Sequence, residues 1–146
     1  TWMQEKTQPV FVVATANDIS LLPFELFRKG RFSEIFFIDL PDASVRQAVI
    51  AQYAKKSLHV DLSEAHMEEL VSISEGFSYS DIEYAIKDVA QLALVDGQSA
   101  VTQEAIVSKF NEIVPISKNN PDMVEKVRKW GLERAVAASS KSEGGR

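Results

Sequence analysis

Two short polar clusters carry the side chains best suited to chemistry. The first, Thr15-Ala-Asn-Asp18, follows an apolar run, so Asn17 could hydrogen-bond a ligand at the end of a strand. The second, Arg28-Lys-Gly-Arg31, carries two guanidinium groups, which can fork onto phosphate oxygens. Each cluster also has a structural interpretation, because Asn and Asp form turns and a basic turn can simply be solvated. Taken separately, neither cluster decides a function.

Composition removes several other kinds of active site. The chain has no cysteine, which excludes disulfides, thiolate metal sites and cysteine nucleophiles. His59 and His66 have no acidic or thiol partners at ligand spacing, so we expect them on the surface and expect no metal site.

The charge distribution argues against a nucleic-acid partner. The net charge is −5, acidic residues gather between positions 42 and 114, and the basic end of the chain is interspersed with acids. No apolar stretch approaches the roughly 20 residues of a membrane span. The sequence therefore predicts neither a nucleic-acid surface nor a membrane segment.

The elements that position the two clusters form a strand, a helix and a strand. Residues 10–15 and 35–40 are short, apolar and rich in β-branched or aromatic residues, which is typical of buried parallel strands. A short helical pattern lies between them, with Pro23 near its start and Gly30 at the position of a C-terminal cap. Because two parallel strands do not make a stable sheet, we expect the remaining strands upstream of Thr1.

From residue 42 the apolar spacing is helical and predicts a bundle of four or five short helices. The residues expected to cap the N-termini of these helices are Asp42, Ser63, Ser80, Thr102 and Asn120. Ser80 is expected to form a capping box with Glu83, and Gly97 and Pro115 are expected to end helices. The predicted fold is thus an α/β fragment followed by an all-α bundle.

Three ordered motifs together resemble the second region of homology of AAA-type (AAA+) ATPases. They are Val12-Val-Ala-Thr-Ala-Asn17, Leu22-Pro-Phe-Glu-Leu-Phe-Arg-Lys-Gly-Arg-Phe32 and Phe36-Phe-Ile-Asp-Leu-Pro41. The helical remainder resembles that family's lid, in which Glu75-Gly-Phe-Ser-Tyr-Ser-Asp-Ile82 is similar to a Gly-Phe-Ser-Gly-Ala-Asp-Leu turn. The segments most similar to one AAA branch, that of cyanobacteria and plastids, are Trp2-Met-Gln-Glu-Lys6 before the first strand and Pro115-Ile-Ser117 to Trp130 after the lid.

The resemblance implies a domain layout for the chain. Residues 1–41 would be the C-terminal part of the αβα nucleotide-binding domain, whose sheet is that of P-loop NTPases. Residues 42–136 would be the helical lid, and residues 137–146 a disordered tail.

The resemblance also implies roles for individual residues. Asn17 matches the sensor-1 position, and Arg28 and Arg31 match arginine fingers that act on ATP in a neighbouring subunit. The residues that would line the adenine-binding side are Gly76, Ser78, Tyr79, Ser80 and Tyr53. For Tyr53 a place in the apolar core is the alternative.

At the level of the whole protein, the resemblance implies a hydrolase that uses ATP with Mg²⁺, both held mainly by residues upstream. The full-length protein is expected to form a homo-oligomeric, hexameric ring, to remodel a macromolecular partner, and to reside in the cytoplasm or plastid stroma. The chain contains no Gly-x-x-x-x-Gly-Lys-[Ser/Thr] loop and no acidic pair after a strand, so we expect the 146 residues alone to be inactive.

Departures from the family pattern keep a second hypothesis open. Tyr79-Ser80 stands where the family has Gly-Ala, Ser33 replaces an Asp, and Lys29 replaces a Pro. These changes and the missing P-loop suggest a catalytically silent ring-assembly or adaptor module. A weaker alternative is a DNA-associated role like that of a clamp loader.

Overall fold

The computed structural model describes residues 10–28 and 31–138. The chain divides into two compact units. The first unit holds the residues up to Asp39 and those from Glu125 on, and the second holds Leu40–Val124. One dividing point lies close to the expected boundary at Pro41-Asp42, and the other lies within a helix that we expected to belong wholly to the lid.

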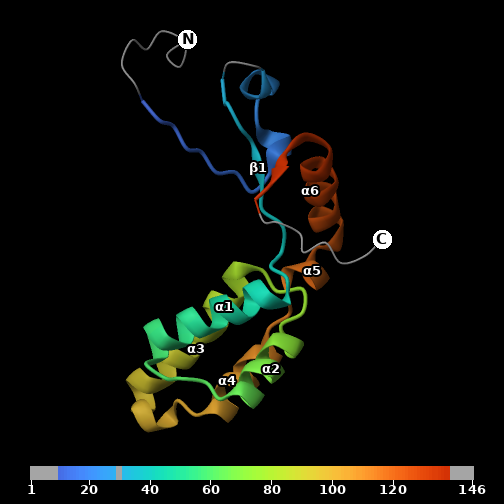
Figure 1. Ribbon diagram of the computed structural model, residues 1–146. Helices are drawn as coiled ribbons and strands as arrows, with labels where there is room; N and C mark the ends of the chain where they lie inside the picture. Colours follow the sequence, from blue (N-terminus) through green and yellow to red (C-terminus); the bar gives the residue numbers. More distant parts are fainter. Residues whose placement is uncertain (1–9, 29–30, 139–146) are drawn as a thin grey trace. The chain divides into compact units, whose positions relative to one another are not determined.

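The second unit is helical and contains the core (Figure 1). Its elements are α1 (Ala43–Tyr53), a π-helical turn (Ala54–Leu58), α2 (Glu64–Ile73), α3 (Tyr79–Asp96), a 3-10 turn (Gln98–Ala100), α4 (Gln103–Glu112) and α5 (Ile116–Asn119). Helix α1 packs against α2 and α3, and α4 packs against α2 and α3. The buried core residues are Ile50, Leu58, Leu70, Phe77, Ile82, Ala85, Ile86, Val89, Ile106 and Phe110.

Most helices of this unit begin where their polar residues predict. The side chains of Asp42, Ser63 and Thr102 accept hydrogen bonds from backbone N–H groups three residues on and so cap α1, α2 and α4. The bond from Val45 N–H also lowers the pKa of Asp42 below its ordinary value. Gly97 follows α3 with a φ of 86°, as its predicted role in ending the helix requires.

The predicted cap of α3 was wrong by two residues. Ser78, not Ser80, is the N-cap, and its partner in the capping box is Asp81, not Glu83. Both serines stand three residues before an acid, so spacing alone did not separate them. Phe77 is buried in the core, and this places Ser78 at the point where the chain enters the helix.

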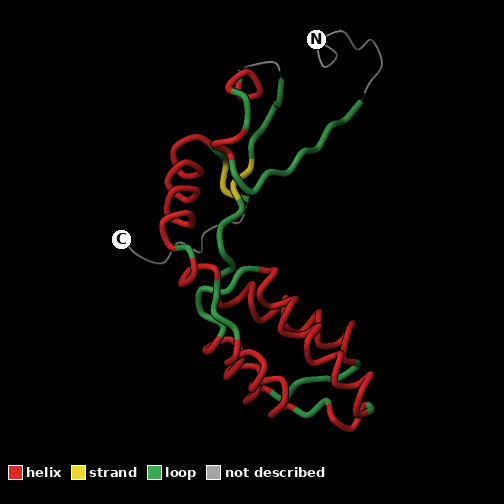
Figure 2. The backbone as a smooth tube through the Cα atoms, turned by 180° about the vertical axis from the view of Figure 1, so that it is seen from behind, coloured by secondary structure: helices red, strands yellow, loops and turns green. Residues whose placement is uncertain are grey.

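The first unit contains two short parallel strands (Figure 2, yellow). Strand β1 (Phe36–Phe37) pairs with β2 (Val136–Ala137), which directly follows α6 (Pro121–Arg134). Upstream of β1 lie 3-10 turns at Ile19–Leu21 and Phe24–Phe27. The predicted fold class, an α/β fragment with two parallel strands followed by a helical region, is confirmed.

The identity of the second strand was predicted wrongly. Residues 10–16 form no regular secondary structure, and the neighbour of β1 is β2 from the other end of the described chain. Apolar composition predicts that a segment suits a strand, but a strand forms only where a neighbour pairs its backbone. The short helix expected before Gly30 is a single 3-10 turn, and Gly30 itself lies outside the described residues.

Candidate functional site

Asn17 lies in a bend after the extended residues 10–16 and just before the turn at Ile19–Leu21. The turn is closed by Leu22 N–H, which donates to Ile19 O at 3.1 Å. Asn17 is exposed, so its side-chain amide is accessible to a ligand. Asn17 was predicted as a site residue because it follows an apolar segment, and in the structure it does follow one, although that segment is not a strand.

Arg28 and Arg31 are the two ends of one backbone turn. Arg31 N–H donates to Arg28 O at 3.2 Å, which brings the two residues close together. Arg28 follows the 3-10 turn Phe24–Phe27, whose last hydrogen bond is donated by Arg28 N–H to Glu25 O at 3.4 Å. The structure therefore brings together the two arginines that the sequence selected.

The guanidinium group of Arg28 pairs with a carboxylate on its own turn. Its Nη1 lies 3.0 Å from Glu25 Oε2, with the two side chains 62% and 59% exposed. Pairs as exposed as this contribute about 0–1 kcal/mol. Because this partner binds weakly, the Arg28 side chain is able to turn toward a phosphate group. Arg31 is half-buried.

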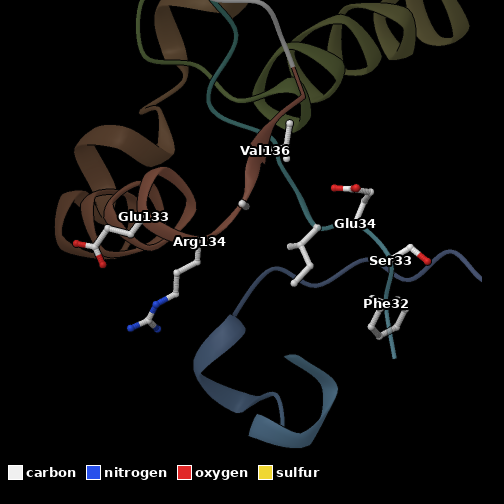
Figure 3. Close-up of a pocket in the computed structure, with 8 residues that line it drawn as sticks. Phe32, Ser33, Glu34, Glu133, Arg134 and Val136 are labelled. Carbon is white, nitrogen blue, oxygen red and sulfur yellow. The ribbon is translucent and has the colours of Figure 1, made fainter. Parts of the chain in front are cut away.

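An open depression of about 400 Å³ lies directly after this turn (Figure 3). One side is formed by residues 32–35, which lead from Arg31 into β1, and the other by residues 133–136, which lead from α6 into β2. Its charged lining residues are Glu34, Glu133 and Arg134. This mixed lining has no single charge sign that would select a phosphate.

The remaining predicted site residues surround the start of α3 in the second unit. Gly76 has a φ of 78°, and a Cβ at this position would collide with Ser117 of α5. The positive φ is the main reason that this position favours glycine, because the Ser117 hydroxyl can rotate away from a Cβ. Ser78 is also engaged, because its hydroxyl donates to Asp81 Oδ2 at 2.9 Å and accepts from Asp81 N–H at 3.1 Å.

Tyr79 and Ser80 are the exposed members of this group. They occupy the first turn of α3, where backbone N–H groups lack partners within the helix. The Tyr79 side chain is 39% exposed and so offers part of its ring to a ligand. Tyr53, at the end of α1, is half-buried and packs against the core, which favours its interpretation as a core aromatic.

Arg46, which was not predicted to have a role, is only 8% exposed. Its Nη1 donates to Pro41 O and its Nη2 to Val71 O, both at 3.0 Å. Arg46 thus ties the chain entering α1 to the last turn of α2, which leads into the turn around Gly76. A signal was available, because Arg46, Ile50 and Tyr53 recur at the spacing of one face of a helix.

Residues 10–28 and 31–138 contain no group of three His, Asp or Glu side chains placed to hold a metal ion. Among the helices described, none combines the length and apolar character needed to cross a bilayer.

Comparison with known proteins places the chain in a family. No protein-family profile matches it. The protein of Guillardia theta described as "Uncharacterized AAA domain-containing protein ycf46" is 38% identical over 140 residues, which are 96% of this chain and 28% of that protein. Its counterpart in Trieres chinensis is 35% identical over 142 residues, covering 97% and 28%. The chain is a portion of an AAA protein.

A more distant AAA relative supports the same assignment. A proteasome-activating nucleotidase of Saccharolobus islandicus is 33% identical over 121 residues, which are 83% of this chain and 30% of the nucleotidase. The AAA resemblance of the three motifs and the lid is thereby confirmed. The chain spans about 28% of the length of the ycf46 proteins that it matches.

Proposed function

We propose that this chain is the C-terminal portion of an ATP-hydrolysing AAA protein and supplies part of a shared nucleotide site. The observation that carries the proposal is the Arg28–Arg31 turn, in a segment whose relatives carry AAA names. Asn17 would act as sensor 1 in the chain's own site. Arg28 and Arg31 would act as fingers in the site of a neighbouring subunit.

The chemistry of phosphoryl transfer suits these residues. Its transition state carries negative charge on the phosphate oxygens. A well-placed arginine stabilises that charge and raises kcat by about 10³- to 10⁵-fold. Guanidinium remains protonated at all physiological pH values and binds two oxygens at once. Arg28 and Arg31, joined by one short turn, could address a single phosphate group together.

The lid residues would contact the other end of the nucleotide. In this proposal Tyr79 and Ser80 approach the adenine, while Gly76 and Ser78 maintain the turn that presents them. Their observed geometry fits this division, because the positive φ of Gly76 favours glycine and the Ser78 hydroxyl is used by the capping box. Tyr53 would support α1 from the core.

The donor set agrees with ATP but leaves the metal to other residues. Arg28, Arg31 and Asn17 offer cationic and amide donors for phosphate oxygens, whereas Mg²⁺ requires carboxylate and hydroxyl oxygens. We place the Mg²⁺ ligands and the phosphate-binding loop in the upstream part of the full-length protein. ATP bound there would supply the phosphoryl group on which the fingers act.

The proposed assembly follows from fingers that act between subunits. We propose a homo-oligomeric ring, a hexamer by analogy with AAA proteins, that remodels a macromolecular partner. We place it in the cytoplasm or plastid stroma, in keeping with the AAA branch that the sequence resembles.

The proposal is tested by removing each finger in the full-length protein. Arg28→Ala and Arg31→Ala should each lower kcat for ATP by about 10³-fold or more, while the affinity for nucleotide changes little. Lys55→Ala removes a positive charge from an exposed position of the second unit and serves as the control. Turnover at the wild-type rate in both arginine variants would contradict the finger assignment.

The alternative function is a catalytically silent ring-assembly or adaptor module. The observation that favours it is Tyr79, whose large side chain stands where AAA proteins have glycine and is partly exposed at the start of α3. Titration of the full-length protein with a fluorescent ATP analogue separates the two functions. Absence of binding, with ring formation intact, would favour the adaptor.

A further inference from the structure

The residue that precedes the arginine turn contacts an aromatic residue from the opposite end of the described chain. Phe27, which immediately precedes Arg28, lies against Trp130 of α6 with ring centroids 5.5 Å apart and ring planes tilted by 59°. Aromatic pairs at such a tilt are worth about 0.5–1.5 kcal/mol beyond the area that they bury. Trp130 is half-buried, and its ring contacts the residue that immediately precedes the turn.

The chain that leaves the turn is attached to the same helix by charge. Arg128 forms a bidentate ion pair with Asp39, in which Nε donates to Oδ2 at 3.0 Å and Nη2 donates to Oδ1 at 2.9 Å. Hydrogen bonding to Asp39 raises the pKa of Arg128 above its ordinary value. The two-pronged geometry fixes direction as well as distance.

Two further contacts lie between these attachments. Val136 N–H donates to Ile35 O and Ala138 N–H donates to Phe37 O, each at 2.9 Å, which joins β2 to β1. The backbone of Gly131 lies so close to the ring of Phe37 that no Cβ fits between them. Residues 27–39 are thus attached to residues 128–138 by ring, ion-pair and backbone contacts.

We propose that residues 125–138, here called the C-terminal arm, position the Arg28–Arg31 turn for its action on the neighbouring subunit. The inference rests on the function proposed above. In the sequence, Arg28 and Arg31 lie between two residues that contact the arm. Phe27 contacts the ring of Trp130, and the carbonyl of Ile35 accepts a hydrogen bond from the arm. Trp130 and Arg128 are positioning residues in this arrangement, since they act through the segment that carries the arginines.

Positioning has a different kinetic signature from general stabilisation. A finger stabilises charge that develops in the transition state, so displacing it lowers kcat and leaves ground-state nucleotide binding unchanged. Displacement by about 1 Å can cost on the order of 100-fold in rate. A residue that only stabilises the fold would instead reduce the fraction of folded protein and leave the kcat of the folded rings unaltered.

The test compares four variants of the full-length protein, assayed as assembled rings. Trp130→Ala should lower kcat about 100-fold with KM within twofold of wild type, and Trp130→Phe should restore most of the rate. Lys129→Ala, at an exposed polar position of the same helix next to Trp130, should behave as wild type. Arg28→Ala is measured beside them to test the proposed function itself.

A charge reversal provides an independent measurement should Trp130→Ala not fold. Arg128→Asp should lower kcat, and adding Asp39→Arg to it should restore the rate by rebuilding the pair in the opposite sense. Restored kcat supports the positioning role, and equal kcat in the single and double variants overturns it.

The possible failures are distinguishable. Wild-type turnover in Arg28→Ala would overturn the proposed function and the inference together. Loss of turnover in Arg28→Ala combined with wild-type kcat in Trp130→Ala would overturn the positioning role alone.

Discussion

Arg46 shows how one residue can join segments that the sequence keeps apart. Its guanidinium donates to carbonyl groups of Pro41 and Val71, and the second of these lies in the last turn of α2. Carbonyl groups at a helix C-terminus lack partners within the helix and attract positive charge. A buried arginine therefore satisfies two acceptors that no apolar residue could satisfy.

We expect Arg46→Ala to destabilise the chain by roughly 2–4 kcal/mol, because it leaves the buried Pro41 carbonyl without its donor, removes one of the two donors to Val71 O and removes a packed side chain. Arg46→Lys should lose less, since an ammonium group can reach one of the two carbonyls. Urea unfolding followed by circular dichroism measures the effect, and Gln47→Ala at the exposed neighbouring position is the control. Identical unfolding midpoints for Arg46→Ala and wild type would refute the role given to the two bonds.

Local capping chemistry made several residues predictable. Asp42, Ser63 and Thr102 cap their helices as expected, because an N-cap bond joins groups only three residues apart. The Ser78–Ser80 ambiguity arose within the same rule, since both serines satisfy the spacing. The burial of Phe77 decided it, and burial depends on the assembled core.

At the scale of elements, the main surprise is that α6 and β2 complete the unit that carries Arg28 and Arg31. The helix was predicted from its Asn120-Pro121 start, and the structure begins it at Pro121. Its association with residues 27–39 was not predicted, because Arg128 and Asp39 are 89 positions apart. No spacing rule reaches over such a distance.

Gly131 offers a test of this packing in which two effects have opposite signs. Alanine is favoured over glycine within a helix by about 1 kcal/mol, so Gly131→Ala should stabilise a freely exposed α6. Against the ring of Phe37 the added methyl group instead forces a shift that costs about 1–3 kcal/mol. We expect a net loss of stability, measured as an earlier unfolding transition of Trp130 fluorescence in a Trp2→Phe background.

A second substitution shows whether the collision is the cause. Replacing Phe37 with leucine should relieve part of the loss in Gly131→Ala, since the smaller side chain leaves room for the methyl group. A stabilised Gly131→Ala variant would show that α6 does not lie against β1 in solution.

At the scale of the whole molecule, the chain comprises two units and about 28% of the length of its ycf46 relatives. Apolar side chains of the first unit are left exposed, among them Phe11 at 92% and Val13 at 76%. The second unit has an enclosed core of its own. This contrast agrees with a first unit that shares its apolar residues with parts of the protein beyond this chain.

We expect the isolated 146-residue chain to release no phosphate from ATP in the presence of Mg²⁺, because it has no phosphate-binding loop. A sensitive phosphate-release assay, with the full-length protein measured in parallel, makes the comparison. Turnover by the isolated chain that disappears in Arg28→Ala would show that the catalytic groups are complete within these residues.

Sequence alone was sufficient for the AAA assignment, for the caps of α1, α2 and α4, and for the closeness of Arg28 to Arg31, because motif spacing, capping and short turns involve residues close together in the chain. Tertiary structure was needed to show that Arg46 donates to a carbonyl of α2 and that β2, not residues 10–15, is the neighbour of β1. It was also needed to show that Trp130 contacts the residue before the arginine turn. These features depend on which distant surfaces bury one another and which backbones pair. That choice is made by the free energy of the assembled fold, which local patterns do not contain.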